Sequence, residues 1–242
     1  LNKEKKKMVN IRLDQVQLVL FSSIIAIVDK LKIANALNEV LSGILNGDPV
    51  ILPIPEEAPL EIPRIQLKSK DDHYNLSIAK NRLDFIFRYK EEDEKTLFPV
   101  PGFLEKFLLM YQYFKENIYT QFSRSAMVTD WIIELEKSPG AEHLLSKYIR
   151  QEVPIREPFE LELHCLTKES IAGINVNKWI RIKSARKISE PKQNKFIAFH
   201  IDINTLAEEA YEFDEELLQR FLRECGKAVH ETIEMHLKRT EE

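Results

Sequence analysis

Glycine and cysteine are scarce in this sequence of 242 residues, which contains six glycines and two cysteines. Loops that bind nucleotide phosphates need closely spaced glycines, because the backbone must approach the phosphate without an intervening side chain. The low glycine content therefore argues against such a loop. Cys165 and Cys225 lie within apolar patterns and form no CxxC pair, so we expect two small buried side chains in a reducing compartment.

Long apolar runs are absent as well. No stretch reaches the roughly 18 apolar residues that a membrane-spanning helix requires, and the early basic run is not followed by the apolar core of a signal peptide. We therefore expect a cytoplasmic protein with no membrane partner, in which residues 1–10 form a disordered basic terminus. The net charge is −4, from 35 basic and 39 acidic side chains, so no overall positive field favours nucleic acid.

Alternating apolar and polar residues predict the strands, and apolar residues at helical spacing predict the helices. The clearest pair lies near the C-terminus, where a strand over 194–204 precedes a helix over 214–237. A strand over 11–21, whose alternation slips once, precedes a helix that we expect to begin at Ser22 or Ser23 and to end near residue 45. A further strand is expected over 158–166.

One order of elements is read twice along the chain: strand, helix, two or three strands, helix, and then strand, helix, three strands, helix. We therefore predict an α+β fold of two similar halves, 11–123 and 124–242, each an antiparallel sheet with helices packed on one face. The two sheets can join edge to edge into one curved sheet. Five prolines between residues 48 and 63 predict an extended connector on the surface of the first half.

The candidate site is the face of the C-terminal strands that lies opposite their apolar residues. Alternation places six side chains there: His164, Trp179, Arg181, Lys183, His200 and Asp202. If the strands pair, these side chains share one side of the sheet. His200 and Asp202 project the same way about 7 Å apart, and with His164 they could form a metal or acid–base cluster. The simpler interpretation is a solvated sheet face with a His–Asp hydrogen bond.

The matching face of the first half carries Arg82 and Arg88. Together with Arg181 and Lys183 these arginines could form a basic surface. Open sheets bind single-stranded nucleic acid when aromatic rings interleave with positive charge. Here the aromatic residues lie mostly on the apolar faces, Trp179 being the exception. This distribution favours an ordinary solvated surface over a nucleic-acid site.

The C-terminal pattern combines the strand 196–204, the pair Phe213-Asp214 and a helix containing residues 228–233. It resembles the end of a sporadically distributed, uncharacterised bacterial protein family. Members of that family end in an apolar strand with an aspartate, followed by a helix with a histidine. The resemblance implies a bacterial or mobile-element origin and directs attention to Asp202 and His230. The family has no assigned activity, so the resemblance implies no catalytic residue.

From these patterns we expect a non-enzymatic binding or assembly module of a bacterial system, such as a defence or mobile-element system, that needs no cofactor. Its polar sheet face or its strand edges would contact a partner protein or a second copy of the chain. Two alternatives stay open. One is a nucleic-acid-binding module that uses the Arg/Lys face, and the other is a metal-dependent hydrolase with a His/Asp site.

Overall fold

The structure, a computed structural model, describes residues 10–90, 93, 98–135, 139–149, 155–186 and 195–241. Its strands are β1 (Asn10–Phe21), β2 (Val50–Ile51), β3 (Ile65–Lys68), β4 (Tyr74–Ile78), β5 (Arg82–Arg88), β6 (Arg124–Glu134), β7 (Glu162–Ile171), β8 (Ile174–Ala185) and β9 (Phe196–Thr205). Its helices are α1 (Lys30–Val40), α2 (Phe103–Asn117), α3 (Gly140–Tyr148) and α4 (Glu215–Glu241). The expected basic terminus lies outside the described residues, except that Asn10 begins β1.

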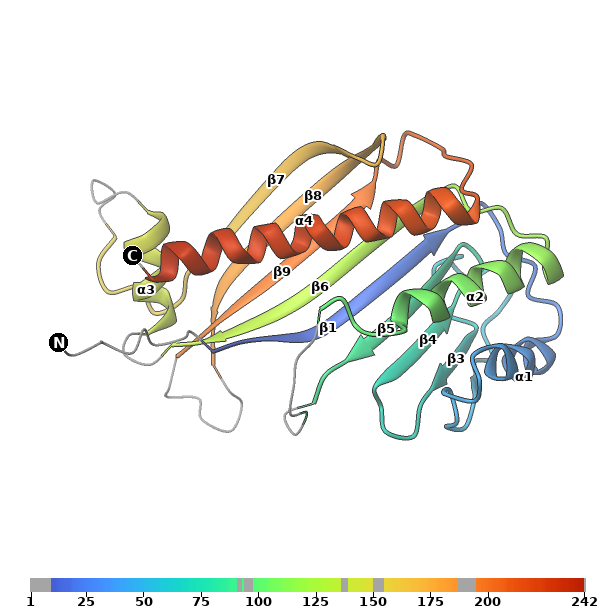
Figure 1. Cartoon of the computed structure of the whole chain (residues 1–242). Helices are drawn as coiled ribbons and strands as arrows, with labels where there is room; N and C mark the ends of the chain where they lie inside the picture. Colours follow the sequence, from blue (N-terminus) through green and yellow to red (C-terminus); the bar gives the residue numbers. More distant parts are fainter. Residues whose placement is uncertain are drawn as a thin grey trace.

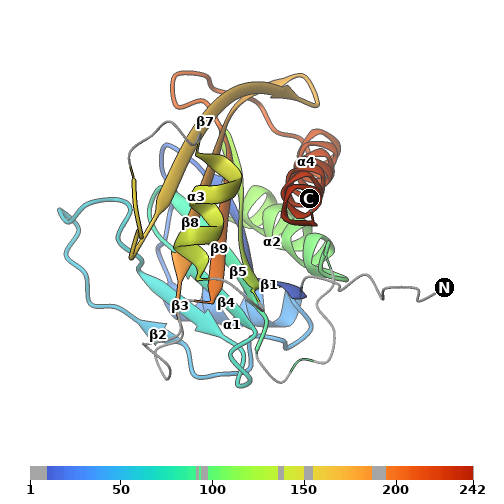
Figure 2. The same cartoon turned by 90° about the vertical axis from the view of Figure 1, so that its left-hand side faces the viewer.

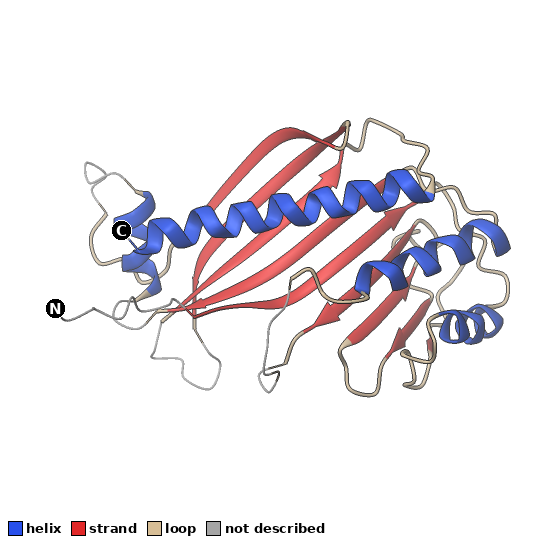
Figure 3. Cartoon of the chain, in the orientation of Figure 1, coloured by secondary structure: helices blue, strands red, loops and turns tan. Residues whose placement is uncertain are grey.

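All nine strands belong to one antiparallel sheet with the order β2-β3-β4-β5-β1-β6-β9-β8-β7 (Figures 1 and 3). The predicted α+β class and the joining of the strands into one open sheet are therefore confirmed. Strands that precede residue 124 form one block of the sheet and later strands form the other, and β1 and β6 meet at the centre. Structural similarity between the two halves stays a prediction.

Helices α2 and α4 lie side by side over one face of the sheet (Figure 2). The Tyr111 hydroxyl of α2 donates to the Phe213 carbonyl just before α4, at 2.6 Å. The inner stripe of α4 is fully buried, as its helical spacing predicts; it comprises Leu218, Phe221, Leu222, Cys225, Val229 and Ile233. Helix α1 contacts α2 and β3, and α3 contacts β8. No helix in the described part of the chain is long and apolar enough to cross a membrane.

Strand β9 shows how alternation separates the two faces of the sheet. Ile197, Phe199, Ile201 and Ile203 are buried, and the residues between them are half-buried. Directly opposed residues of paired strands project to the same side, so the register extends this division to the other strands. We call the side that carries His200 the open face. Its members include Arg12, Gln15, Gln17, Phe21, Lys68, Arg82, Asp84, Arg88, Arg124, Val128, Asp130, Ile132, Glu134, Glu162, His164, Leu166, Lys168, Trp179, Arg181, Lys183, Ala198, His200, Asp202 and Asn204.

Helix α1 begins at Lys30, so the expected start at Ser22 or Ser23 is wrong. The backbone N–H groups of Ser22 and Ile25 instead donate to the carbonyls of residues 81 and 80, at 2.9 and 2.6 Å. These bonds join the segment to the turn between β4 and β5, so its N–H groups do not form the hydrogen bonds of a helix. Asp29 caps α1, because its carboxylate accepts from the Lys32 N–H at 3.0 Å.

Strand β7 also differs from its prediction, since it runs over Glu162–Ile171 rather than 158–166. A tight turn joins it to β8 through Ala172 and Gly173, whose φ angles of 54° and 82° are typical of a type I′ hairpin. β7 is an edge strand, and Cys165 within it is exposed, so its expected burial is wrong. Cys225, on the inner stripe of α4, is buried as expected.

Candidate functional site

One row of side chains crosses six neighbouring strands at the middle of the open face. Each member lies directly opposite the next in the strand register, and the row runs His164, Arg181, His200, Asp130, Gln15 and Arg88. We call these six residues the central row. Four of them, His164, Arg181, His200 and Arg88, are site residues predicted from sequence alternation. The structure therefore brings residues from both halves of the chain into one line.

Hydrogen bonds between neighbours hold two pairs of the central row. The His200 Nδ1 atom lies 2.7 Å from Asp130 Oδ1, and their side chains are 34% and 32% exposed. On β5, the Arg88 Nε–H donates to Gln15 Oε1 at 3.2 Å. Partly exposed groups that are fixed by a neighbour are already oriented before a partner arrives.

A β-bulge adds a second carboxylate beside the central row. The β1–β6 register shifts between Leu13 and Gln15, which leaves Asp14 as the extra residue. The slip in alternation within 11–21 is the sequence signal of this bulge. Burial raises the pKa of the Asp14 carboxyl above its ordinary value; Arg12 opposes the rise, Asp130 adds to it, and Arg88 opposes it.

A hollow of about 300 Å³ lies against the central row. Its lining includes residues of the next row, where the small Ala198 lies between Lys183 and Ile132 in the strand register. Basic side chains line it from Arg181, Lys183 and His200, and acidic side chains line it from Asp14, Asp130 and Glu162. The hollow therefore presents both signs of charge within one small volume.

Trp179 and Asp202 lie opposite each other in the strand register. Their row borders the central row on the side away from Ala198. The guanidinium of Arg181 is 5.7 Å from the centroid of the Trp179 ring. Asp202 accepts a hydrogen bond from the Asn204 amide at 2.9 Å. Both predicted residues thus belong to the site and, like His200, already have a partner on the open face.

Arg82 is the predicted site residue that lies apart. It is six residues from Arg88 along β5, or about 20 Å at the rise of an extended strand. Its Nε–H donates to Asp84 Oδ2 at 2.8 Å. Arg82 and Arg124 both place their guanidinium groups over the Phe21 ring, 5.1 and 4.8 Å from its centroid. This aromatic–arginine cluster marks the far end of the open face.

The three side chains of the suggested metal cluster have separate partners. His164 Nε2 lies 2.9 Å from Glu162 Oε1, His200 bonds Asp130, and Asp202 bonds an amide. Arg181 stands between the two histidines in the register. Among the described residues, no group of three or more His, Cys, Asp or Glu side chains is arranged to hold a metal ion.

Sequence patterns did not place Gln15, Asp130 or Asp14 at this site, because nothing local fixes their distance from His200. Only the pairing of β1 with β6 brings them beside His200, and no local pattern specifies which strands meet at the centre of a sheet. The two positions indicated by the family resemblance lie on different sides of the molecule, since Asp202 is on the open face and His230 on α4. No protein-family model matches the sequence, and no curated protein matches it.

Proposed function

We propose that the protein is a non-enzymatic binding module that docks a partner protein on its open face, within a bacterial system. The observation that carries this proposal is the central row, which extends over six strands and draws on both halves of the chain. Its members are half-buried or exposed, and two pairs of them, His200–Asp130 and Arg88–Gln15, are already held by hydrogen bonds.

The balance of charge on the open face favours a protein over a nucleic acid. Its basic side chains are Arg12, Lys68, Arg82, Arg88, Arg124, Lys168, Arg181 and Lys183, and its acidic side chains are Asp84, Asp130, Glu134, Glu162 and Asp202, with Asp14 of the bulge beside them. Nucleic-acid affinity depends on basic groups that displace counterions from phosphates. Interspersed acidic groups oppose that attraction, whereas a protein surface can match both signs.

The His200–Asp130 pair is also the arrangement that orients a general base. Covalent catalysis of the Ser–His type requires a hydroxyl or thiol within reach of the imidazole. The neighbours of His200 in the register are Arg181 and Asp130, neither of which has such a group. The pair is therefore better explained as a fixed polar contact within a docking surface.

Single-stranded nucleic acid is the second candidate, because two aromatic rings, Phe21 and Trp179, lie on the open face beside arginines. Bases stack on such rings in proteins that bind single strands. At Phe21, however, the guanidinium groups of Arg82 and Arg124 already occupy the ring. Either arginine would have to move before a base could stack there.

A photo-crosslinking residue at position 198 tests the proposal, because Ala198 lies in the central hollow. The same residue at Arg220, an exposed position of α4, is the matched control. We expect irradiation in an extract of the source cells to yield a protein adduct from position 198 and none of the same mass from position 220. An adduct that nuclease removes would support nucleic acid instead, and identical adducts from both positions would contradict docking on the open face. A crosslinked dimer specific to position 198 would identify a second copy as the partner.

A further inference from the structure

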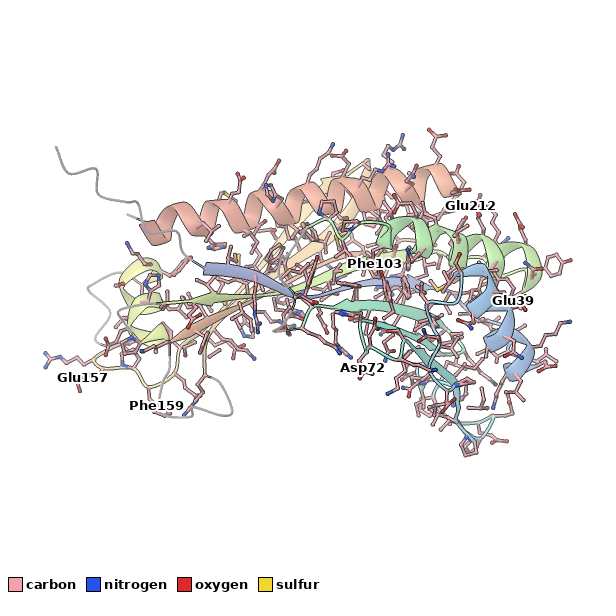
Figure 4. The ribbon with its side chains drawn as sticks, turned by 60° about the horizontal axis from the view of Figure 1, so that its bottom comes forward. Glu39, Asp72, Phe103, Glu157, Phe159 and Glu212 are labelled. Atoms are coloured by element: carbon pink, nitrogen blue, oxygen red, sulfur yellow. The ribbon has the colours of Figure 1, made fainter. Side chains whose placement is uncertain are left out.

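A second and larger cavity lies on the helix side of the sheet. Its volume is about 670 Å³, and it is lined by β1, β6, residues 98–102, the start of α2 and the middle of α4. Figure 4 shows the sheet close to edge-on, with α2 and α4 above it and Phe103 labelled at the start of α2. This volume is within the range of pockets that bind small molecules. The open face lies on the other side of the sheet.

The inner surface of this cavity is apolar. Val16 and Leu18 of β1 and Met127 of β6 form its floor, and Phe103 and Leu222 contribute from the two helices. All five side chains are at most 6% exposed. A molecule that fills the cavity must therefore bring an apolar body.

Gly226 of α4 leaves open space in the cavity, because it has no side chain. It lines the cavity, and a Cβ atom placed on it would meet no other atom within 4 Å. Glycine in the middle of a helix lowers helix stability relative to alanine. No close contact at Gly226 requires the missing side chain, so open space is what the glycine provides.

Three basic side chains of α4 lie at the rim of the cavity. Arg223, Lys227 and His230 all line it, and their spacing of four and then three residues places them on one stripe of the helix. Lys227 is paired with Glu224 at 2.6 Å, and His230 with Glu234 at 3.0 Å.

Arg223 differs from these two, because it has no hydrogen bond or ion pair with another described residue. Glu105 and Glu231 also line the rim, so it carries two carboxylates against three basic groups. Arg223 is therefore the group that is available for an anion.

We propose that this cavity binds a small amphipathic carboxylic acid. Its hydrocarbon part lies over Val16, Leu18 and Met127, and its carboxylate pairs with Arg223. The positive end of the α2 dipole, beside the same cavity, adds to the attraction for an anion. This site does not depend on partner binding at the open face, so either proposal can fail without the other.

Calorimetric titration with decanoate, and with decanol as its neutral analogue, tests this inference on the full chain. We expect decanoate to bind at one site, about tenfold or more tightly than decanol, because a charge-assisted hydrogen bond is lost with the alcohol. Arg223→Ala should weaken decanoate binding by a similar factor and leave decanol binding unchanged. Arg181→Ala, on the open face, should change neither.

Gly226→Leu and Gly226→Ala form the matched pair that locates the site. The leucine side chain projects into the cavity beside Met127 and Leu222 and should abolish binding of both ligands, whereas alanine leaves most of the space and should retain binding. Both variants should melt at or above the wild-type temperature, because each replaces a helical glycine. Undetectable decanoate binding to the wild type, or unchanged binding to a folded Gly226→Leu variant, would overturn the proposal. Equal affinity for acid and alcohol would overturn the role of Arg223.

Discussion

The imidazole Nδ1 of His200 lies 2.7 Å from Asp130 Oδ1, across the pair formed by β9 and β6. The two residues are far apart in the sequence and meet only because β6 and β9 are neighbours in the sheet. Their bond lies at the middle of the central row, between Arg181 on one side and Gln15 on the other. The strength of this contact therefore reports on the middle of the open face.

A double-mutant cycle measures the strength of this contact. His200→Ala and Asp130→Ala, singly and together, should reveal a coupling of about 0.2–1 kcal/mol in the free energy of unfolding, as found for partly exposed pairs. The exposed pair His164–Glu162, whose side chains are 49% and 52% accessible, is the control. Its coupling should be smaller because solvent screens it more. A larger coupling for His164–Glu162 would contradict this order.

Neighbouring residues of β9 should respond very differently to truncation. Phe199 is buried beneath the helices and His200 is half-buried on the open face. Phe199→Ala should lower the free energy of unfolding by about 3–5 kcal/mol, because it removes a large core side chain and leaves a cavity. His200→Ala should cost about 1 kcal/mol or less. Urea denaturation of both variants checks this, and similar losses would show that the two faces are not as different as the alternation indicates.

Asp14→Asn should stabilise the protein more at pH 7 than at pH 3. Burial raises the pKa of Asp14 in the folded state above its ordinary value of 3.8. The ionised carboxylate therefore costs stability as the pH rises through this raised pKa, and the protonated form costs none below the unfolded value. The gain should be small, since the side chain is 47% exposed and solvent screens it. Melting temperatures of the wild type and the variant at both pH values check this prediction. A larger stabilisation at pH 3 than at pH 7 would contradict it.

The two cysteines should differ in their reaction with a thiol reagent. Cys165 is exposed on the edge strand and Cys225 is buried, and burial raises the pKa of the Cys225 thiol. One thiol per chain should react with Ellman's reagent under native conditions, and two should react in denaturant. Cys165→Ser is the control, because it should abolish the native reaction. Rapid modification of both thiols in the folded protein would contradict the buried position of Cys225.

Period-two alternation predicted the faces of the strands well, because burial on one side of a sheet leaves a direct mark on the sequence. It assigned Phe199 and His200 to opposite faces, and it registered the bulge at Asp14 as a slip. It also placed Arg88 and Arg181 on polar faces. Their position in one row depends on long-range pairing, for which the sequence of a single strand holds no signal.

The errors at α1 and Cys165 have the same origin. Residues 22–28 contain apolar side chains at helical spacing, yet their backbone bonds the turn between β4 and β5. Tertiary hydrogen bonds therefore overrode the local helical pattern. Cys165 alternates like a core residue, but β7 is an edge strand and the residue is exposed. Edge position depends on the order of strands in the sheet, which alternation does not encode.

The most direct test of docking on the open face is an equilibrium binding titration with the purified partner recovered from position 198. The Arg88→Glu/Arg181→Glu variant reverses charge at two places in the central row, and Arg220→Glu reverses one charge on α4 as the control. We predict that the double variant binds at least about tenfold more weakly than the wild type, because mismatched charges at an interface cost several kcal/mol. The control should bind within about twofold of the wild type, as expected for residues outside an interface. If the double variant bound the partner as tightly as the wild type does, the partner would not dock on the open face.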